Sequence, residues 1–245
     1  MYPILFSIDG VNLYTHGLLM VIGIGLGSLI LYSIAKRKGY ETKFLFDLII
    51  YSVLGGLIGS RILYLLLYFN QFANWKEMLF IWYGGLVSYG GIIGGFLVVW
   101  AVLAYRKKPI LEWFDMGIVG FMVGWGIGRV GCLLAGDSLG LISSSRIAIW
   151  GRIPTQLFES IWSIVVALIC FWLLGRKEKF NLPDGFIFGV GLASYALGRF
   201  VVDFCRDDAP LFWIFKAGQI GSLVIFLLLA FILIVTVKRL KRKEF

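Results

Sequence analysis

Residues 124–140 read GWGIGRVGCLLAGDSLG, a glycine-rich stretch that ends the apolar block over 111–135. The block places Arg129 inside a segment long enough to cross a bilayer's hydrocarbon core, which is about 30 Å thick. The stretch also contains a G-x-G-x-x-G pattern starting at Gly126, but dinucleotide binding by that pattern needs a preceding strand in a soluble βαβ unit. An uninterrupted apolar block excludes that context, so the stretch predicts a membrane helix that enters an outer loop.

The composition of the whole chain is typical of a membrane protein. Of its 245 residues, 60% are hydrophobic and 15% are charged, whereas soluble domains carry about 25% charged residues. The apolar blocks are continuous, which distinguishes them from the alternating strands of a β-barrel. We predict an all-α polytopic integral membrane protein that forms a single domain over 1–245. About seven transmembrane helices are expected, at 12–35, 44–69, 84–105, 111–135, 155–174, 184–204 and 216–237.

Basic residues gather in alternate connectors between these helices. Of the 23 Lys and Arg residues, 15 lie in 36–43, 105–109, 175–184 and 238–245. Because positive residues mark cytoplasmic loops, the N-terminus is predicted to lie outside and the C-terminus in the cytoplasm. The net charge of +9 is therefore a topology signal. We expect the lipid bilayer as a partner and no nucleic acid.

The cysteine and histidine content limits the chemistry of the chain. Cys132, Cys170 and Cys205 lie far apart, which argues against a disulfide framework and shows no zinc-site spacing. The single histidine, His16, excludes a site with several histidine ligands. We therefore expect no metal and no cofactor. The N-terminal apolar run follows no basic segment, so no cleavable signal peptide is expected.

Glycines recur at four-residue spacing in two of the predicted helices. Gly120, Gly124 and Gly128 follow this spacing in one helix, and Gly90 and Gly94 follow it in another. Small residues four apart let membrane helices approach each other closely. We therefore predict close helix packing at both positions.

Three arginines, Arg61, Arg129 and Arg199, lie within or at the edge of apolar blocks. A charged side chain at membrane depth costs about 2.5–3.5 kcal/mol even on the insertion scale. An acidic partner or an anionic ligand can offset this cost, and an arginine near a helix end can also extend to the interface. The placement of all three in one leaflet favours a polar pocket. The break from helix at GDSLG (136–140) would add backbone amides able to bind an anion.

Six separated motifs resemble those of the bacterial prolipoprotein diacylglyceryl transferases. GRVGCLLAGDSLG (128–140) is similar to that family's signature, in which G-R-x-G-N-F precedes an acidic residue and a glycine. The resemblance covers nearly the whole chain. The other five motifs are MYPILFSI (1–8), LIGSRILYLLLY (57–68), GGLVSYGGIIGG (84–95), RIPTQLFES (152–160) and LGRFVVDFCRDD (197–208).

The resemblance implies an enzyme of the bacterial inner membrane whose active site lies in the outer half of the bilayer. That family transfers diacylglyceryl from phosphatidylglycerol to the lipobox cysteine thiol of a preprolipoprotein and releases glycerol phosphate. Because the nucleophile belongs to the substrate, the enzyme holds the lipid phosphate and helps to deprotonate the thiol. Two alternatives stay open. One is a related membrane transferase that uses a glycerophospholipid or polyprenyl donor with another acceptor, and the other is an inactive lipid-binding paralogue.

The resemblance also assigns roles to the arginines. It implies that Arg129 and Arg199 belong to the catalytic set and bind the lipid phosphate, with Arg61 as a supporting contact. Guanidinium groups suit this task because they stay charged and grip phosphate oxygens in a bidentate way. Gly140, which belongs to the signature motif, is assigned to the substrate-binding set.

Three acidic residues, Asp137, Glu159 and Asp203, complete the predicted substrate-binding region. Asp203 follows Arg199 by four residues, so both lie on one helix face and a salt bridge is predicted. For each of the three carboxylates, a structural ion pair that keeps an arginine in the membrane is the alternative to a direct role in the reaction.

Three positions depart from the family pattern. Tyr89 stands where most members carry histidine, Cys132 stands where they carry asparagine, and His16 stands where tyrosine is common. If positions 16 and 89 face one cavity, His16 retains a proton acceptor at a different wall, and both residues enter the predicted catalytic set. Alternatively, His16 is a structural residue. Cys132 is assigned to the substrate-binding set, with a buried apolar role or a covalent acyl or glyceryl carrier as alternatives.

Overall fold

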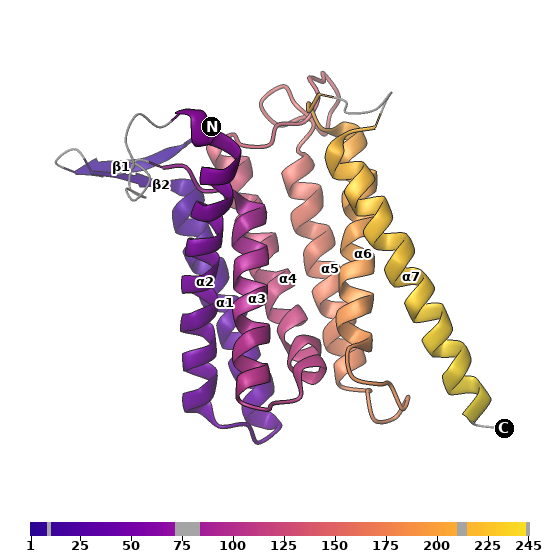
Figure 1. The fold of residues 1–245 in the computed structure, drawn as a ribbon. Coiled ribbons are helices and arrows are strands. Elements are labelled where there is room, and N and C mark those ends of the chain that lie inside the picture. Colours follow the sequence, from indigo (N-terminus) through magenta and orange to yellow (C-terminus); the bar gives the residue numbers. More distant parts are fainter. Residues whose placement is uncertain (9–10, 72–83, 210–214, 244–245) are drawn as a thin grey trace. The chain divides into compact units, whose positions relative to one another are not determined.

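The computed structural model describes residues 1–8, 11–71, 84–209 and 215–243. In this part of the chain, seven helices are long and apolar enough to cross a membrane, which confirms the polytopic all-α class. These helices are α1 (Thr15–Arg37), α2 (Thr42–Tyr68), α3 (Ser88–Tyr105), α4 (Ile110–Ala135), α5 (Thr155–Leu174), α6 (Phe186–Val202) and α7 (Ala217–Lys243) (Figure 1). Two short 3₁₀ helices follow α2 and α6, namely η1 (Phe69–Gln71) and η4 (Asp203–Cys205).

The helix boundaries differ most from the predicted ones at the C-terminal end of α7, which extends six residues beyond 237, and at the N-terminal ends of α1 and α3. The first helix begins at Thr15 because strands β1 (Ile4–Ile8) and β2 (Val11–Tyr14) form an antiparallel hairpin before it. These two strands were not predicted from the sequence. The third helix begins four residues later than predicted because Gly84 and Gly85 have φ angles of +89° and +81°, which an α-helix does not contain.

The chain divides into two compact units, and each is described on its own. The first unit comprises Met1–Ile34 and Leu111–Phe245, and the second comprises Ala35–Ile110. The first therefore contains α1 and α4 to α7, whereas the second contains α2 and α3. The single-domain organisation over 1–245 stays a prediction.

In the first unit, α1 and α4 pack backbone against backbone through glycines. A methyl group on Gly124 would lie 2.8 Å from the carbonyl oxygen of Gly23, and a methyl group on Gly23 would lie 2.5 Å from that of Gly124. Gly120 faces Gly27 in the same way. These contacts confirm the predicted close packing at the Gly120–Gly124 spacing.

Also in the first unit, α5, α6 and α7 lie side by side in chain order (Figure 1). Asp115 joins α4 to the start of α6, because its carboxylate accepts hydrogen bonds from the amides of Gly185 (3.0 Å) and Phe188 (2.9 Å). Lys177, in the connector, pairs with Asp115 at 2.7 Å and with Asp184 at 2.6 Å. Burial opposes the charge of Lys177, but these two carboxylates outweigh it and raise the lysine's pKa.

In the second unit, α2 and α3 meet at a second pair of glycine rows. A methyl group on Gly94 would lie 2.9 Å from the Cα atom of Gly59, which confirms the close approach predicted for this helix. Buried Arg61 of α2 holds the turn before α3, donating from Nη1 to the carbonyl oxygens of Gly84 (2.8 Å) and Gly85 (3.1 Å).

Candidate active site

Buried charged side chains gather in the first unit at the end where α4 finishes, α5 begins and α6 finishes. Successive helices run in opposite directions, so these three helix ends lie at one side of the unit. Arg129 lies near the end of α4, Glu159 near the start of α5, and Arg199 in the last turn of α6. Asp203 follows directly in η4. Sequence segments separated by 30 to 40 residues thus supply one cluster.

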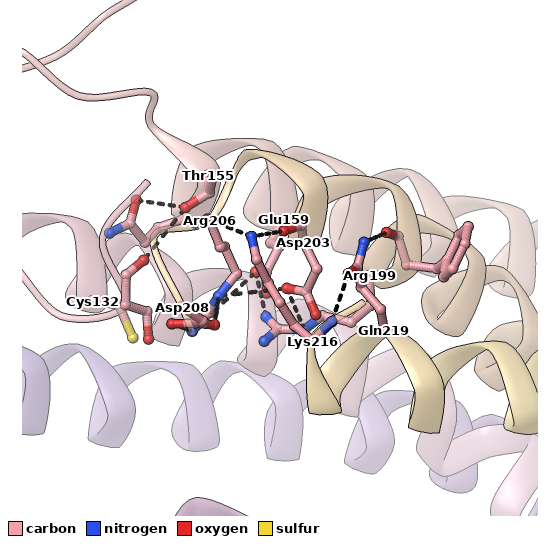
Figure 2. A network of polar contacts seen from close by, with 12 residues as sticks. Cys132, Thr155, Glu159, Arg199, Asp203, Arg206, Asp208, Lys216 and Gln219 are labelled. Atoms are coloured by element: carbon pink, nitrogen blue, oxygen red, sulfur yellow. Dashed lines mark hydrogen bonds and ion pairs between the residues drawn. The ribbon is translucent and has the colours of Figure 1, made fainter. Parts of the chain in front are cut away.

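Glu159 lies at the centre of this cluster (Figure 2). Its Oε1 atom accepts a hydrogen bond from Nη2 of Arg129 and another from Nη1 of Arg199, each at 2.5 Å. Nη1 of Arg206 lies 3.8 Å from the same oxygen. The glutamate is 2% exposed, and its Oε2 atom accepts no hydrogen bond from the described residues. One buried carboxylate therefore positions three guanidinium groups.

Asp203 forms the second anionic centre of the cluster. Its Oδ1 atom lies 3.2 Å from Nε of Arg199, which confirms the predicted salt bridge between positions four residues apart. The same oxygen lies 3.5 Å from Nε of Arg206. At the start of α7, Lys216 donates from Nζ to the carbonyl oxygens of Asp203 (2.6 Å) and Arg206 (2.5 Å). These bonds fix the backbone turn that follows α6.

Asp208 pairs with Arg206 at the outer side of the cluster. Its two carboxylate oxygens accept from Nε (2.7 Å) and Nη2 (3.3 Å) of the arginine. Burial opposes both charges, but the mutual hydrogen bonds outweigh it, so the pKa of Arg206 is raised and the pKa of Asp208 is lowered. Both side chains therefore stay ionised in the cluster.

Positive charge exceeds negative charge in the cluster as the structure describes it. Four cations meet three carboxylates, leaving an excess of one positive charge. The cations are Arg129, Arg199, Arg206 and Lys216, and the carboxylates are Glu159, Asp203 and Asp208. In addition, Nε of Arg129 has no acceptor among the described residues. A buried guanidinium with an unused donor suits an anionic ligand.

His16 and Cys132, which depart from the family pattern separately, lie next to each other. The Cys132 sulfur is 3.5 Å from Nδ1 of His16, although 116 positions separate the two residues. It also accepts a hydrogen bond from Nη1 of Arg129 at 3.6 Å. The neighbouring Thr15 donates its hydroxyl to the carbonyl oxygen of Tyr2 and so fixes the start of α1. The cluster thus carries a thiol and an imidazole next to the guanidinium group of Arg129.

Gly140 is placed for close backbone packing. It pairs with Arg206 in an antiparallel bridge, and a methyl group on it would lie 3.1 Å from the carbonyl oxygen of Cys205. Its own carbonyl oxygen accepts from Nη1 of Arg152 at 2.9 Å, and that arginine also pairs with Asp207 at 2.8 Å. The glycine therefore holds the loop after α4 against the segment that carries Arg206.

The remaining predicted residues are Asp137, Arg61 and Tyr89. Asp137 is exposed, and its carboxylate makes no hydrogen bond or ion pair with the described residues. Arg61 and Tyr89 belong to the second unit, where Arg61 binds two carbonyl oxygens and the Tyr89 side chain is 63% exposed. Their assigned roles stay predictions.

Three cluster residues, Arg206, Asp208 and Lys216, were not predicted. Arg206 lies in the quoted motif 197–208, seven residues after Arg199, so two helical turns would have placed it on the same face. Lys216 carried no signal, because a lysine at the start of an apolar helix is typical of any membrane interface.

Comparison with known proteins agrees with the motifs. The family model for prolipoprotein diacylglyceryl transferase matches residues 3–235. Phosphatidylglycerol–prolipoprotein diacylglyceryl transferase 2 of Clostridium perfringens is 31% identical, with 98% of this chain and 97% of the relative covered. The transferase of Clostridium tetani is 28% identical (85% and 86% covered), and that of Streptococcus uberis is 28% identical (92% of each). The chain belongs to the prolipoprotein diacylglyceryl transferase family.

Proposed function

We propose that this chain transfers diacylglyceryl from phosphatidylglycerol to the lipobox cysteine thiol of a preprolipoprotein and releases glycerol phosphate. The names of its relatives supply the reaction. The observation that carries the proposal is the buried cluster around Glu159, which has an excess of one positive charge and an unused donor on Arg129. A phosphodiester carries one negative charge, so the lipid donor balances the cluster.

In the proposed reaction, the acceptor sulfur attacks the glycerol carbon of the donor, and the bond from that carbon to the phosphate oxygen breaks. Negative charge then grows on the leaving phosphate. Arg129 and Arg199 bind this group, because both guanidiniums are buried or nearly so and are held by Glu159. Preorganised cations in a site that excludes water stabilise such developing charge. Arg206 extends the same set of cations.

His16 takes the proton of the acceptor thiol in this proposal. Its ring is only partly buried and lies beside Cys132, which in turn contacts Arg129. An imidazole accepts a proton near neutral pH, whereas a phenol such as Tyr89 does so poorly. The two sulfur atoms and the imidazole are then grouped next to the phosphate-binding cations.

We further propose that the cluster lies in the outer half of the bacterial inner membrane. It occupies the end of α4 opposite to the connector 105–109, which is one of the four basic segments. The positive-inside rule assigns such segments to the cytoplasm. This orientation places the N-terminus outside and the C-terminus in the cytoplasm.

The proposal is tested by incubating the purified chain with phosphatidylglycerol vesicles and a lipobox peptide. Mass spectrometry measures the diacylglyceryl adduct, and an enzymatic assay measures free glycerol phosphate. We expect both products in equal amounts from the wild type and neither from Arg129→Ala. Arg146→Ala, which changes an exposed loop arginine, is the matched control and should retain activity.

Two results would contradict the proposal. Release of glycerol phosphate without peptide modification would assign the donor correctly but require another acceptor. No release from a wild type that is folded by circular dichroism would identify a lipid-binding paralogue.

A further inference from the structure

Cys132 lies between two groups that change the chemistry of a thiol. Its sulfur is 3.5 Å from the imidazole of His16 and 3.6 Å from a guanidinium nitrogen of Arg129. An imidazole and a cation beside a thiol are the surroundings in which protein cysteines become nucleophilic. The residue is buried, with 7% of its surface exposed.

Two unused polar atoms, one on Arg129 and one on its partner Glu159, indicate independently that a ligand binds at this arginine. Nε of Arg129 has no acceptor and Oε2 of Glu159 has no donor among the described residues, although these residues are only 7% and 2% exposed. Buried polar atoms without partners are rare in proteins. The guanidinium with the unused Nε is also the one that contacts the Cys132 sulfur. A ligand that binds to this Nε atom would therefore lie near Cys132.

The other two cysteines have different surroundings. Cys170 is fully buried in α5 and its thiol donates to the carbonyl oxygen of Ile187 at 3.8 Å. Cys205 is half-buried in η4, and its thiol makes no hydrogen bond with the described residues. Of the three thiols, Cys132 is the one that contacts both an imidazole and a guanidinium. Cys132 is therefore the cysteine whose surroundings favour a nucleophilic thiol.

We propose that Cys132 is a modification site that exchanges disulfides with the cysteine of the acceptor segment. The inference rests on the proposed function, because it requires an acceptor whose sulfur is brought to His16. When that acceptor sulfur is part of a disulfide, the Cys132 sulfur attacks it and passes its own proton to the imidazole. The original S–S bond breaks, its second sulfur leaves as a thiolate, and a disulfide joins Cys132 to the acceptor.

Transfer of diacylglyceryl through Cys132 is the competing role, and its chemistry is unfavourable. A diacylglyceryl group on Cys132 would be a thioether, the same bond that the final product contains. A second thiol would have to displace a thiolate from carbon, with no phosphate as leaving group. Disulfide exchange needs no such step, because sulfur is the electrophile and a thiolate leaves it readily.

The test uses a lipobox peptide whose cysteine carries a thionitrobenzoate group, added to the purified full chain in lipid nanodiscs. We expect one thionitrobenzoate released per chain, the peptide on Cys132 by mass spectrometry, and loss of diacylglyceryl transfer. Dithiothreitol should restore the transfer activity. His16→Ala should slow the exchange by about tenfold, because the imidazole no longer takes the proton.

Two variants and one peptide serve as controls. Cys132→Ser should release no thionitrobenzoate, whereas Cys205→Ser should react like the wild type. An activated peptide with a scrambled sequence around its cysteine should react more slowly than the lipobox peptide. Equal reaction of Cys132→Ser, attachment to Cys205, or unchanged transfer after complete labelling would each overturn the inference.

The transfer assay on the unlabelled chain separates this inference from the proposed function. A chain that transfers diacylglyceryl but leaves Cys132 unlabelled refutes the modification site alone. A chain that is labelled at Cys132 but forms no diacylglyceryl adduct refutes the proposed reaction. Disulfide exchange at Cys132 is still supported in that case, because the lipobox peptide binds and reacts there.

Discussion

Replacement of Glu159 by glutamine removes the negative charge at the centre of the cluster and keeps the shape of the side chain. In the wild type, the Oε1 atom of Glu159 accepts hydrogen bonds from Arg129 and Arg199 at 2.5 Å each, and Nη1 of Arg206 lies 3.8 Å away. The excess positive charge would rise from one to two in a buried region. Removing one partner of a buried ion pair typically costs about 3–5 kcal/mol, because the other charge stays buried without compensation.

This loss of stability should lower the melting temperature by a measurable amount. For a chain of this size, 1 kcal/mol corresponds to about 2–4 °C, so Glu159→Gln should melt roughly 6–20 °C below the wild type. Tryptophan fluorescence of the protein in nanodiscs measures the transition. The transfer rate should fall as well, because the two guanidiniums lose the carboxylate that positions them.

Asp137→Asn is the matched control, since Asp137 is an exposed carboxylate without an ion pair among the described residues. Its melting temperature should change little, as surface substitutions usually stay within about 0.5 kcal/mol. The second variant Glu159→Gln/Arg206→Gln removes a cation along with the anion and should recover part of the lost stability. Equal melting temperatures for Glu159→Gln and Asp137→Asn would refute the assignment of Glu159 as the organising charge.

Three further predictions follow from the packing and the charges. Arg129→Lys should keep the fold but lower the transfer rate by about 10²-fold, because lysine lacks the planar donor set, as steady-state kinetics will measure. Gly120→Ala should cost about 1–3 kcal/mol, because its methyl group meets the backbone of α1, whereas Gly117→Ala, with open space around it, should cost nothing in the same thermal unfolding assay. The raised pKa of Lys177 stabilises the fold fully below the ordinary lysine value of 10.5 and loses this contribution as pH rises through the folded-state value, so a stability–pH titration should show an alkaline decline that Lys177→Met lacks.

The membrane helices were predictable because length and apolarity alone decide whether a segment crosses a bilayer. The Arg199–Asp203 pair was predictable because four residues separate neighbours on one helix face. The N-terminal hairpin was missed, since its apolar residues continue into α1 and resemble part of a membrane helix.

The contacts that assemble the cluster depend on tertiary packing instead. Nothing local connects Arg129 to Glu159 across 30 positions, or His16 to Cys132 across 116. The resemblance named all four residues as candidates, but their pairing follows from which helix faces meet. The close approach of α1 to α4 at Gly23 and Gly124 brings His16 and Cys132 to the same level.

The sharing of one carboxylate oxygen by Arg129 and Arg199 bears on how the proposed reaction is accelerated. In the proposed reaction, a phosphodiester with a single, delocalised charge would compete with Glu159 for these donors, so the arginines would bind the donor lipid only moderately. As the bond to carbon breaks, charge concentrates on the leaving phosphate and the competition shifts in its favour. Interactions that strengthen between ground state and transition state are those that raise the rate. Glu159 therefore serves the proposed reaction by restraining the arginines until the phosphate becomes the stronger partner.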